Sequence, residues 1–270
     1  MKDKVINKLK KLTKHNFIEL TSRGNTAIFA SLYCSRKINS RRKTILVPDQ
    51  GGWFTYIKYP KMLRLETKEV KTDYGIIDLK DLKQKSKDSC ALIYSDPAGY
   101  FAEQPIKEIH NICKKNNCLV ILDITGSISE TTNNADFLVS SFGRWKPINL
   151  GYGGFVSTNK KEYFEKSKEI FNTTTFDDSY IEPLQKKLKN LKKRYELFEK
   201  TNKKVKEDLK NFNILHKDKK GPNVVVKFTS DEEKEKIINY CKKHNLEYTL
   251  CPRYIRVNEN AVSIEIKRLE

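Results

Sequence analysis

The sequence lacks several features that mark whole classes of protein. No run of about 18 apolar residues occurs in its 270 residues, which excludes a transmembrane helix. The lysine-rich first residues lead into an amphipathic stretch instead of the apolar core of a signal peptide. The six cysteines include no Cys-x-x-Cys pair, and none lies near a histidine at zinc-ligand spacing. We therefore expect a soluble cytoplasmic protein with no membrane contact, no metal site and reduced, mostly buried thiols.

Acidic residues are scarce relative to basic ones. The chain has 34 Asp and Glu against 53 Lys and Arg, a formal net charge of +19. Such a surplus is typical either of a protein that binds nucleic acid or of one with a lysine-rich solvated surface. The lysines are spread along nearly every surface segment, which favours the second interpretation. Composition alone does not separate the two.

Short apolar runs alternate with helical patterns over the first two thirds of the chain. The expected helices span 1–20, 26–34 and 106–115, and the expected strands span 44–48, 90–97, 118–123, 135–141 and 154–158. Continuously apolar strands separated by helices indicate an α/β fold, in which a mostly parallel central sheet is covered by helices on both faces.

The last third of the chain has a different pattern. Apolar residues recur every three or four positions over 183–212, which predicts one long amphipathic helix with a lysine-rich outer face. Beyond it we expect a small α+β domain with a helix at 231–245 and strands at 223–228, near 248, at 254–257 and at 262–266. The predicted organisation is a large domain over 1–182, a connecting helix over 183–212 and a small C-terminal domain over 213–270.

Polar and glycine-rich residues cluster at the carboxyl ends of the predicted strands, where parallel sheets bind ligands. Among them, Lys146 lies in a segment that leaves a strand and runs into glycines. A lysine amine must lose its proton to attack a carbonyl, and it does so when a neighbour desolvates it or carries positive charge. The adjacent Trp145 could desolvate the amine, and Arg144 carries positive charge.

Three further features point to a flat, phosphorylated cofactor. Asp123 ends the run Leu-Val-Ile-Leu-Asp, and a carboxylate at a strand end can keep a pyridine nitrogen protonated. Gly24, Asn25 and Thr26 begin a helix, whose free N–H groups suit a phosphate. Trp53 follows two glycines and presents an aromatic face for stacking.

The order of these features along the chain resembles the fold-type I pyridoxal-phosphate (PLP) enzymes of the aspartate aminotransferase superfamily. The resemblance is nearest to the DegT-type aminotransferases, whose lysine segment reads Ser-Phe-His-x-x-Lys, then four residues, then Gly-x-Gly-Gly. Ser141-Phe142, Lys146 and 151–154 reproduce this spacing without a gap. The family histidine is replaced here by Gly143, and the residue three positions after the aspartate is Gly126 instead of Gln or His.

The resemblance implies a role for each matching residue. Lys146 would form the internal aldimine and shuttle the substrate's α-proton, Asp123 would pair with the pyridine nitrogen, and Trp53 would stack on the ring. The resemblance also implies phosphate ligands, a contact on the hydroxyl side of the ring, and an active site shared between two subunits of a homodimer. Gly24, Asn25 and Ser141 would hold the phosphate. Asp96 would contact the hydroxyl side of the ring.

Arg256 resembles the small-domain arginine that grips the substrate α-carboxylate in amino-acid aminotransferases, because a guanidinium can donate two parallel hydrogen bonds to a carboxylate. A solvated strand arginine beside Arg253 is the alternative. Arg144 is the second candidate for the substrate. If Arg256 is the clamp, the substrate is an amino acid instead of a nucleotide sugar.

Three hypotheses follow. The first is a PLP-dependent aminotransferase or related enzyme that acts on a small-molecule amino acid or amino sugar. The second is a PLP enzyme acting on an aminoacyl group carried by tRNA, which the net charge recommends but which the spread of lysines disfavours. The third is a non-catalytic binding protein of the same fold, motivated by the replaced family residues and the short chain.

Overall fold

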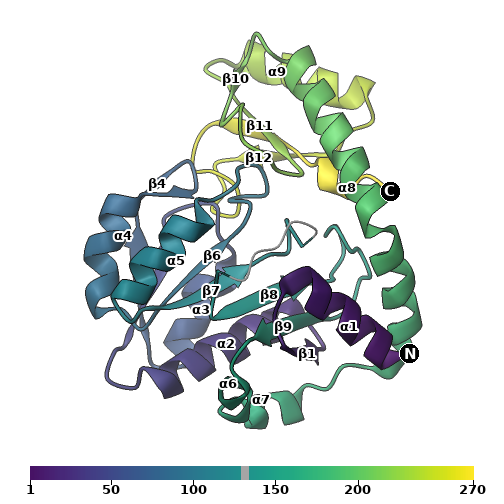
Figure 1. The fold of residues 1–270 in the computed structure, drawn as a ribbon. Coiled ribbons are helices and arrows are strands. Elements are labelled where there is room, and N and C mark those ends of the chain that lie inside the picture. The colour runs from purple at the N-terminus through teal and green to yellow at the C-terminus, as the bar shows by residue number, and fades with distance from the viewer. Residues whose placement is uncertain (129–133) are drawn as a thin grey trace.

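The computed structural model describes residues 1–128 and 134–270. Within them, the larger sheet has seven strands in the order β1-β9-β8-β7-β6-β2-β3 (Figure 1). The five strands from β8 to β3 are parallel, whereas β9 runs antiparallel to both β8 and β1. This confirms the mostly parallel α/β sheet. The strands are β1 (Phe17–Thr21), β2 (Thr44–Pro48), β3 (Glu66–Val70), β6 (Ala91–Ser95), β7 (Leu119–Asp123), β8 (Phe137–Ser141) and β9 (Gly154–Thr158).

Helices cover both faces of this sheet. Alternate residues of a strand point to opposite faces, and here both sets are apolar. For example, Leu46 and Leu92 belong to one buried cluster, and Ile45 and Ile93 belong to the other. The first face is covered by α1 (Lys2–Thr13), α4 (Leu79–Lys85), α5 (Ile106–Lys115) and the start of α8 (Ile181–Asp208). The second is covered by α2 (Gly24–Ile38), α3 (Phe54–Met62), α6 (Lys161–Glu165) and α7 (Lys168–Thr173).

The prediction of one helix over 1–20 was wrong. Helix α1 ends at Thr13, and Lys14 takes the left-handed conformation that terminates a helix. The chain then enters β1, which pairs with β9 from Phe17 opposite Thr158. This pairing is a contact between residues about 140 positions apart, so the local apolar spacing carried no sign of it.

The C-terminal part forms a second, antiparallel sheet, in the order β10-β11-β13-β12. Its strands are β10 (Asn213–Ile214), β11 (Val224–Lys227), β12 (Tyr248–Cys251) and β13 (Ala261–Ile264), and α9 (Asp231–Lys243) packs on it. The strand predicted at 254–257 is a turn instead, in which the Arg256 amide donates to the Arg253 carbonyl at 2.8 Å. A short hairpin of β4 (Thr72–Asp73) and β5 (Ile76–Ile77) lies in the larger unit.

Helix α8 connects the two sheets and was expected over 183–212. It begins two residues earlier and ends at Asp208, and Figure 1 shows it running along one side of the molecule. Leu184 and Leu188 pack on the larger sheet, and Phe198 and Val205 pack on the smaller one. The buried Asn202 donates from Nδ2 to the carbonyls of two residues in the chain before β11, at 2.8 and 3.0 Å.

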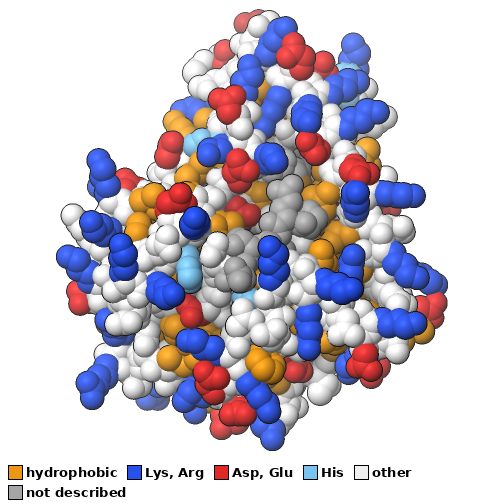
Figure 2. Space-filling model, in the orientation of Figure 1, with side chains coloured by type: hydrophobic (Ala, Val, Ile, Leu, Met, Phe, Trp, Pro, Cys, Tyr) orange, Lys and Arg blue, Asp and Glu red, His pale blue; other side chains and the backbone are white. Residues whose placement is uncertain are grey.

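The distribution of surface charge and the burial of the cysteines agree with what the composition suggested. Figure 2 shows Lys and Arg side chains interspersed with Asp and Glu over the whole visible face. All six cysteines are buried, as expected. Among the described residues, no helix is long and apolar enough to cross a membrane.

Candidate functional site

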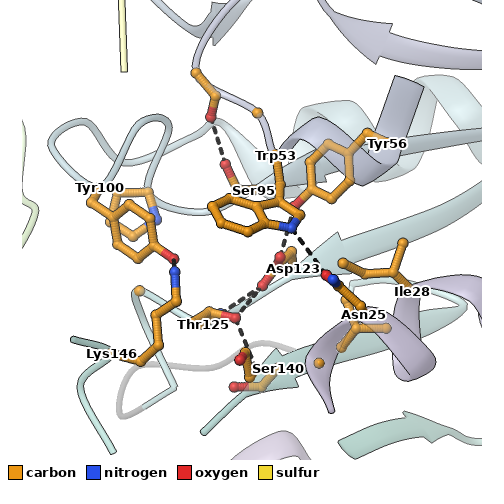
Figure 3. Close-up of a pocket in the computed structure, with 17 residues that line it drawn as sticks. Asn25, Ile28, Trp53, Tyr56, Ser95, Tyr100, Asp123, Thr125, Ser140 and Lys146 are labelled. Atoms are coloured by element: carbon orange, nitrogen blue, oxygen red, sulfur yellow. Dashed lines mark hydrogen bonds between the residues drawn. The ribbon is translucent and has the colours of Figure 1, made fainter. Parts of the chain in front are cut away.

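A pocket lies at the carboxyl ends of the parallel strands, where the sequence predicted a site (Figure 3). The ends of β2, β6, β7 and β8 supply its walls, and the N-terminus of α2 closes one side. The lining residues are Gly24, Asn25, Ile28, Gly51, Gly52, Trp53, Tyr56, Ser95, Pro97, Tyr100, Asp123, Thr125, Gly126, Val139, Ser140, Ser141 and Lys146. Six of the ten residues predicted for the site are among them.

Asp123 lies at the floor of the pocket and accepts three hydrogen bonds. The Tyr56 hydroxyl from α3 donates to Oδ2 at 2.7 Å, and Thr125 donates to Oδ1 from its amide at 2.9 Å and from its hydroxyl at 2.5 Å. Burial, followed by the Asp123 carboxylate, raises the pKa of Tyr56 well above its ordinary value. Tyr56 therefore keeps its proton and acts as a hydrogen-bond donor to the carboxylate.

Lys146 reaches the same pocket from the loop after β8. Its Nζ donates to the Tyr100 hydroxyl at 2.9 Å and lies 4.7 Å from the centroid of the Trp53 ring. The Trp53 indole is oriented in turn by its Nε1, which donates to Oδ1 of Asn25 at 3.0 Å. In Figure 3 the indole lies above Asp123, with Lys146 to one side. Lysine, aromatic ring and carboxylate are thus brought together from three separate segments.

The N-terminus of α2 forms the other end of the pocket. The side chain of Arg23, the N-cap residue of α2, accepts no hydrogen bond from the first backbone amides of the helix in the described structure. These amides, at the positive end of the helix dipole, are therefore not capped by a side chain on the pocket side. Gly24 permits a close approach to β8, because an added Cβ would lie 2.4 Å from Cβ of Ser141. Beside it, the buried Ser140 hydroxyl has no hydrogen-bond partner among the described residues. This end can accept an anionic oxygen-rich group.

Four of the ten predicted site residues are not in the pocket lining, and Thr26, Asp96 and Arg144 are three of them. The Thr26 amide donates to the Arg23 carbonyl at 3.1 Å. Asp96 lines the neighbouring cavity instead, and its Oδ1 accepts from the Gln104 amide at 2.9 Å. Arg144 is exposed, and its guanidinium lies 4.8 Å from the centroid of the Trp145 ring. The expected contacts of these residues with a cofactor or substrate stay predictions.

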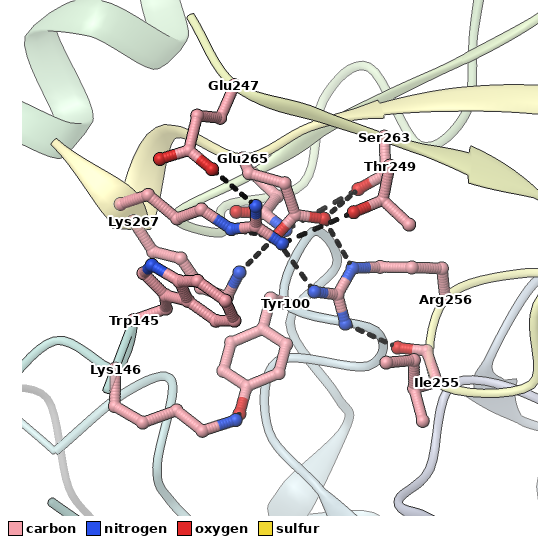
Figure 4. Close-up of polar contacts among 12 residues, drawn as sticks. Tyr100, Trp145, Lys146, Glu247, Thr249, Ile255, Arg256, Ser263, Glu265 and Lys267 are labelled. Atoms are coloured by element: carbon pink, nitrogen blue, oxygen red, sulfur yellow. Dashed lines mark hydrogen bonds and ion pairs between the residues drawn. The ribbon is translucent and has the colours of Figure 1, made fainter. Parts of the chain in front are cut away.

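Arg256 is also outside the pocket lining, and its guanidinium already holds a carboxylate. Its Nε and Nη2 each donate to one oxygen of Glu265 at 2.8 Å (Figure 4). Both side chains are buried, with 4% and 1% of their surface exposed. The alternative of a solvated strand arginine is wrong, because Arg256 is buried and lies in a turn, while the substrate clamp stays a prediction. The competing carboxylate is nine residues further along the chain, on the segment after β13.

Sequence reasoning did not single out three residues that the structure places around the lysine and the aspartate. They are Tyr56, Tyr100 and Thr125. Thr125 follows Asp123 by two residues, a spacing at which an aspartate commonly accepts a backbone hydrogen bond. The two tyrosines come from other segments, and no local pattern distinguishes them from the other tyrosines of the chain.

A second, larger cavity of about 840 Å³ borders the pocket. The two cavities share Pro97 and Gly126, and α8 forms much of the wall of the second. Eight lysines line it, including Lys189, Lys192 and Lys206 of α8, together with five acidic residues. Lysines of α8 thus border this cavity, and Lys189 and Lys192 remain exposed to solvent.

Sequence comparisons with known proteins give one family match and one curated relative. The C-terminal residues 189–270 match the model of the MJ1341 family C-terminal domain. The curated relative found is a probable glycine dehydrogenase (decarboxylating) subunit 1 of Staphylothermus marinus. It is 31% identical over 144 residues, which cover 48% of this chain and 30% of the relative. The chain thus spans less than a third of the length of that relative.

Solved structures match nearly the whole chain. A DegT DnrJ EryC1 StrS aminotransferase from Brucella abortus superposes with a TM-score of 0.76 at 13% identity, covering 97% of this chain and 84% of that one. A 3-amino-5-hydroxybenzoic acid synthase gives 0.76 at 12%, covering 98% and 86%. A serine palmitoyltransferase variant from S. paucimobilis with bound PLP gives 0.72 at 16%, covering 97% and 70%. The chain therefore has the fold of the fold-type I PLP-dependent transferases.

Proposed function

We propose that this protein binds PLP in the strand-end pocket and is an aminotransferase or related enzyme acting on a small primary amine. The observation that carries the proposal is the meeting of Lys146, Trp53 and Asp123 at one pocket, from three different segments. The neighbours of the same fold include aminotransferases and a PLP-bound enzyme, which supports the choice of cofactor.

The residues present fit the chemical groups of PLP. Asp123, held by three donors, suits a protonated ring nitrogen, and the Trp53 face suits the ring. The amides at Gly24 and Asn25 suit the phosphate, as do Ser141 and the Ser140 hydroxyl, which has no partner within residues 1–128 and 134–270. When bound, PLP supplies an electron sink that stabilises negative charge at the substrate carbon.

The chain's own residues then supply binding and proton transfer. Lys146 is the general base that takes the proton from the substrate carbon and returns it. Tyr100 accepts a hydrogen bond from the lysine amine and so fixes the side on which the amine works. Tyr56 and Thr125 hold the Asp123 carboxylate in place by three hydrogen bonds, and there it would pair with the ring nitrogen.

We also propose that the protein is a cytoplasmic homodimer. Two large apolar side chains next to pocket residues, Phe54 and Trp145, are 40% and 43% exposed, and a second subunit could cover them. Six buried, unpaired thiols suit a reducing compartment. Sedimentation of the purified protein tests the dimer, and a monomer at micromolar concentration contradicts it.

Absorption spectroscopy tests the main proposal. We expect the protein mixed with PLP and dialysed to keep a visible absorption band that Lys146→Ala loses. The matched control is Lys160→Ala, which removes an exposed lysine at the far end of β9. Absence of a band from the wild-type protein, or a band that persists unchanged in Lys146→Ala, contradicts the proposal. Spectral change on adding amines then identifies the substrate class.

A further inference from the structure

A buried ion cluster lies on the opposite side of Tyr100 from Lys146. It consists of Arg256, Glu265 and Lys267 (Figure 4). The Arg256 guanidinium and the Lys267 amine each lie 5.0 Å from the centroid of the Tyr100 ring. Because the Tyr100 hydroxyl accepts from Lys146, the ring separates the cluster from the pocket amine.

Glu265 satisfies the carboxylate-binding capacity of this cluster. Its two oxygens receive the parallel pair of hydrogen bonds from Arg256, and they also accept from the Ser263 hydroxyl at 3.0 Å and from the Lys267 amine. The remaining nitrogen of the guanidinium, Nη1, donates to the Ile255 carbonyl at 2.7 Å. A fork of this kind is the geometry in which an arginine binds a ligand carboxylate. Here a carboxylate of the same chain occupies it.

The pocket offers little else to a substrate carboxylate. Among the described residues that line it, Lys146 is the one cationic side chain, and its amine has a different task in the proposed function. A carboxylate that entered would lose hydration without gaining a charged partner, which is costly in a buried site. To reach Arg256 it would have to pass Tyr100 and displace Glu265, which is almost fully buried.

We propose that Glu265 acts as a built-in carboxylate that occupies Arg256, so that the pocket takes primary amines with no free carboxylate on the amine-bearing carbon. Amino sugars and amino acids blocked as amides or esters belong to this class. The inference rests on the proposed function, since it names the substrate class of the same site. It makes Glu265 a specificity-determining residue that does not itself touch the substrate.

A matched pair of amines tests the substrate class. L-Alanine and L-alaninamide differ at the carboxyl group alone, and each is titrated into the PLP-loaded protein while the visible band is followed. With concentrations expressed as unprotonated amine, we expect the amide to bind at least tenfold more tightly. Equal affinities, or tighter binding of alanine, overturn the proposal.

A measurement without cofactor tests the role of Glu265. Glu265→Ala leaves a carboxylate-sized space beside Arg256, so formate should raise its unfolding temperature by several degrees more than it raises that of wild type. The matched control is Glu247→Ala, which removes an exposed partner of Arg268, and chloride at equal ionic strength controls for screening. No selective stabilisation by formate overturns the proposal.

Glu265→Gln keeps the shape of the side chain and provides a second variant if Glu265→Ala does not fold. In this variant the tenfold preference for the amide should narrow, and an unchanged preference overturns the proposal. The outcomes separate the two claims. A wild-type protein without a visible band defeats the proposed function, whereas a protein with a band that binds alanine as well as the amide defeats the substrate class alone.

Discussion

At the scale of single residues, the Asp123 carboxylate depends on donors from outside its own strand. Tyr56 is fully buried and its hydroxyl donates a hydrogen bond to Oδ2 of Asp123. Thr125 donates two hydrogen bonds to Oδ1, from its amide and from its hydroxyl. A hydrogen bond to a charged group contributes more than one between neutral groups. The position of the Asp123 carboxylate in the pocket is therefore set as much by α3 as by β7.

Tyr56→Phe should lower the free energy of unfolding by about 1.5–3 kcal/mol, because the buried carboxylate loses a donor and gains no water in its place. Urea denaturation measures this loss. The affinity for PLP, read from the visible band, should fall as well. Tyr59→Phe is the matched control, since Tyr59 lies on the same helix and packs edge-on against Phe29. A stability equal to that of wild type contradicts the assigned hydrogen bond.

A second residue-scale consequence concerns Lys267. Burial, with the adjacent Arg256 charge, lowers the pKa of Lys267 to about 7. Lys267 lies beside Arg256, Glu265 and the Tyr100 ring, and the charge of Lys146 acts on it from beyond that ring. Because the unfolded chain binds this proton more tightly, the contribution of Lys267 to stability rises with pH from about 7 to about 10.

Replacement by Lys267→Met should remove this pH dependence. Relative to the variant, the wild-type protein should gain stability between pH 7 and pH 10, by at most about 5 kcal/mol if the whole shift is expressed. Denaturation midpoints of both proteins at pH 6, 8 and 10 give the comparison. Lys243→Met, at the exposed end of α9, provides the control. Parallel pH profiles for wild type and Lys267→Met would count against the low pKa.

At the scale of elements, the approach of α2 to β8 shapes the anion-binding end of the pocket. Gly24 is the first residue of α2, and its missing side chain lets the helix start lie against Ser141 and Gly154. Added atoms in such a contact force backbone shifts that cost about 1–3 kcal/mol. The same contact sets where the helix amides point.

Gly24→Ala should therefore destabilise the fold by about 1–3 kcal/mol and weaken phosphate-dependent binding of PLP. Thermal unfolding and titration of PLP against pyridoxal measure the two effects. In Gly143→Ala, the nearest atom to the new Cβ would be the Ser141 hydroxyl at 3.2 Å, so this variant should be close to neutral. Equal behaviour of the two variants would show that the close approach is unimportant.

At the scale of the whole molecule, the net charge of +19 is distributed and not concentrated. Ion pairs within α8, such as Lys186 with Glu182 and Lys203 with Glu199, neutralise part of its lysine-rich face. The acidic side chains between the lysines in Figure 2 do the same elsewhere on that face. Binding driven by scattered charge is weak and sensitive to salt.

Retention on immobilised tRNA should accordingly disappear near 150 mM salt. A column run at increasing ionic strength measures it, with single-stranded DNA of similar length as the control for charge alone. Selective retention of tRNA at physiological ionic strength would revive the aminoacyl-tRNA hypothesis. In that case the α8 lysines that line the larger cavity, Lys189 and Lys192, are the first to replace.

Much of the large unit could be predicted from the sequence, because its signals are local. Five apolar runs became β2, β6, β7, β8 and β9, and their carboxyl ends carry Asp123 and Lys146 as expected. The lysine spacing and the glycines near it are also local signals. The strands β1 and β3 were missed, since their polar residues carry no comparable apolar run and pairing decides their state.

The class of fold and the order of the pocket residues along the chain follow from local sequence, because burial patterns and strand-end motifs depend on neighbouring residues. The hydrogen-bond and ion-pair partners of those residues depend on how the chain folds. The tertiary structure joins Tyr56 to Asp123, Tyr100 to Lys146 and Glu265 to Arg256. These contacts arise when separate elements pack together, so no spacing along the chain foretells that an arginine expected to bind substrate is already paired.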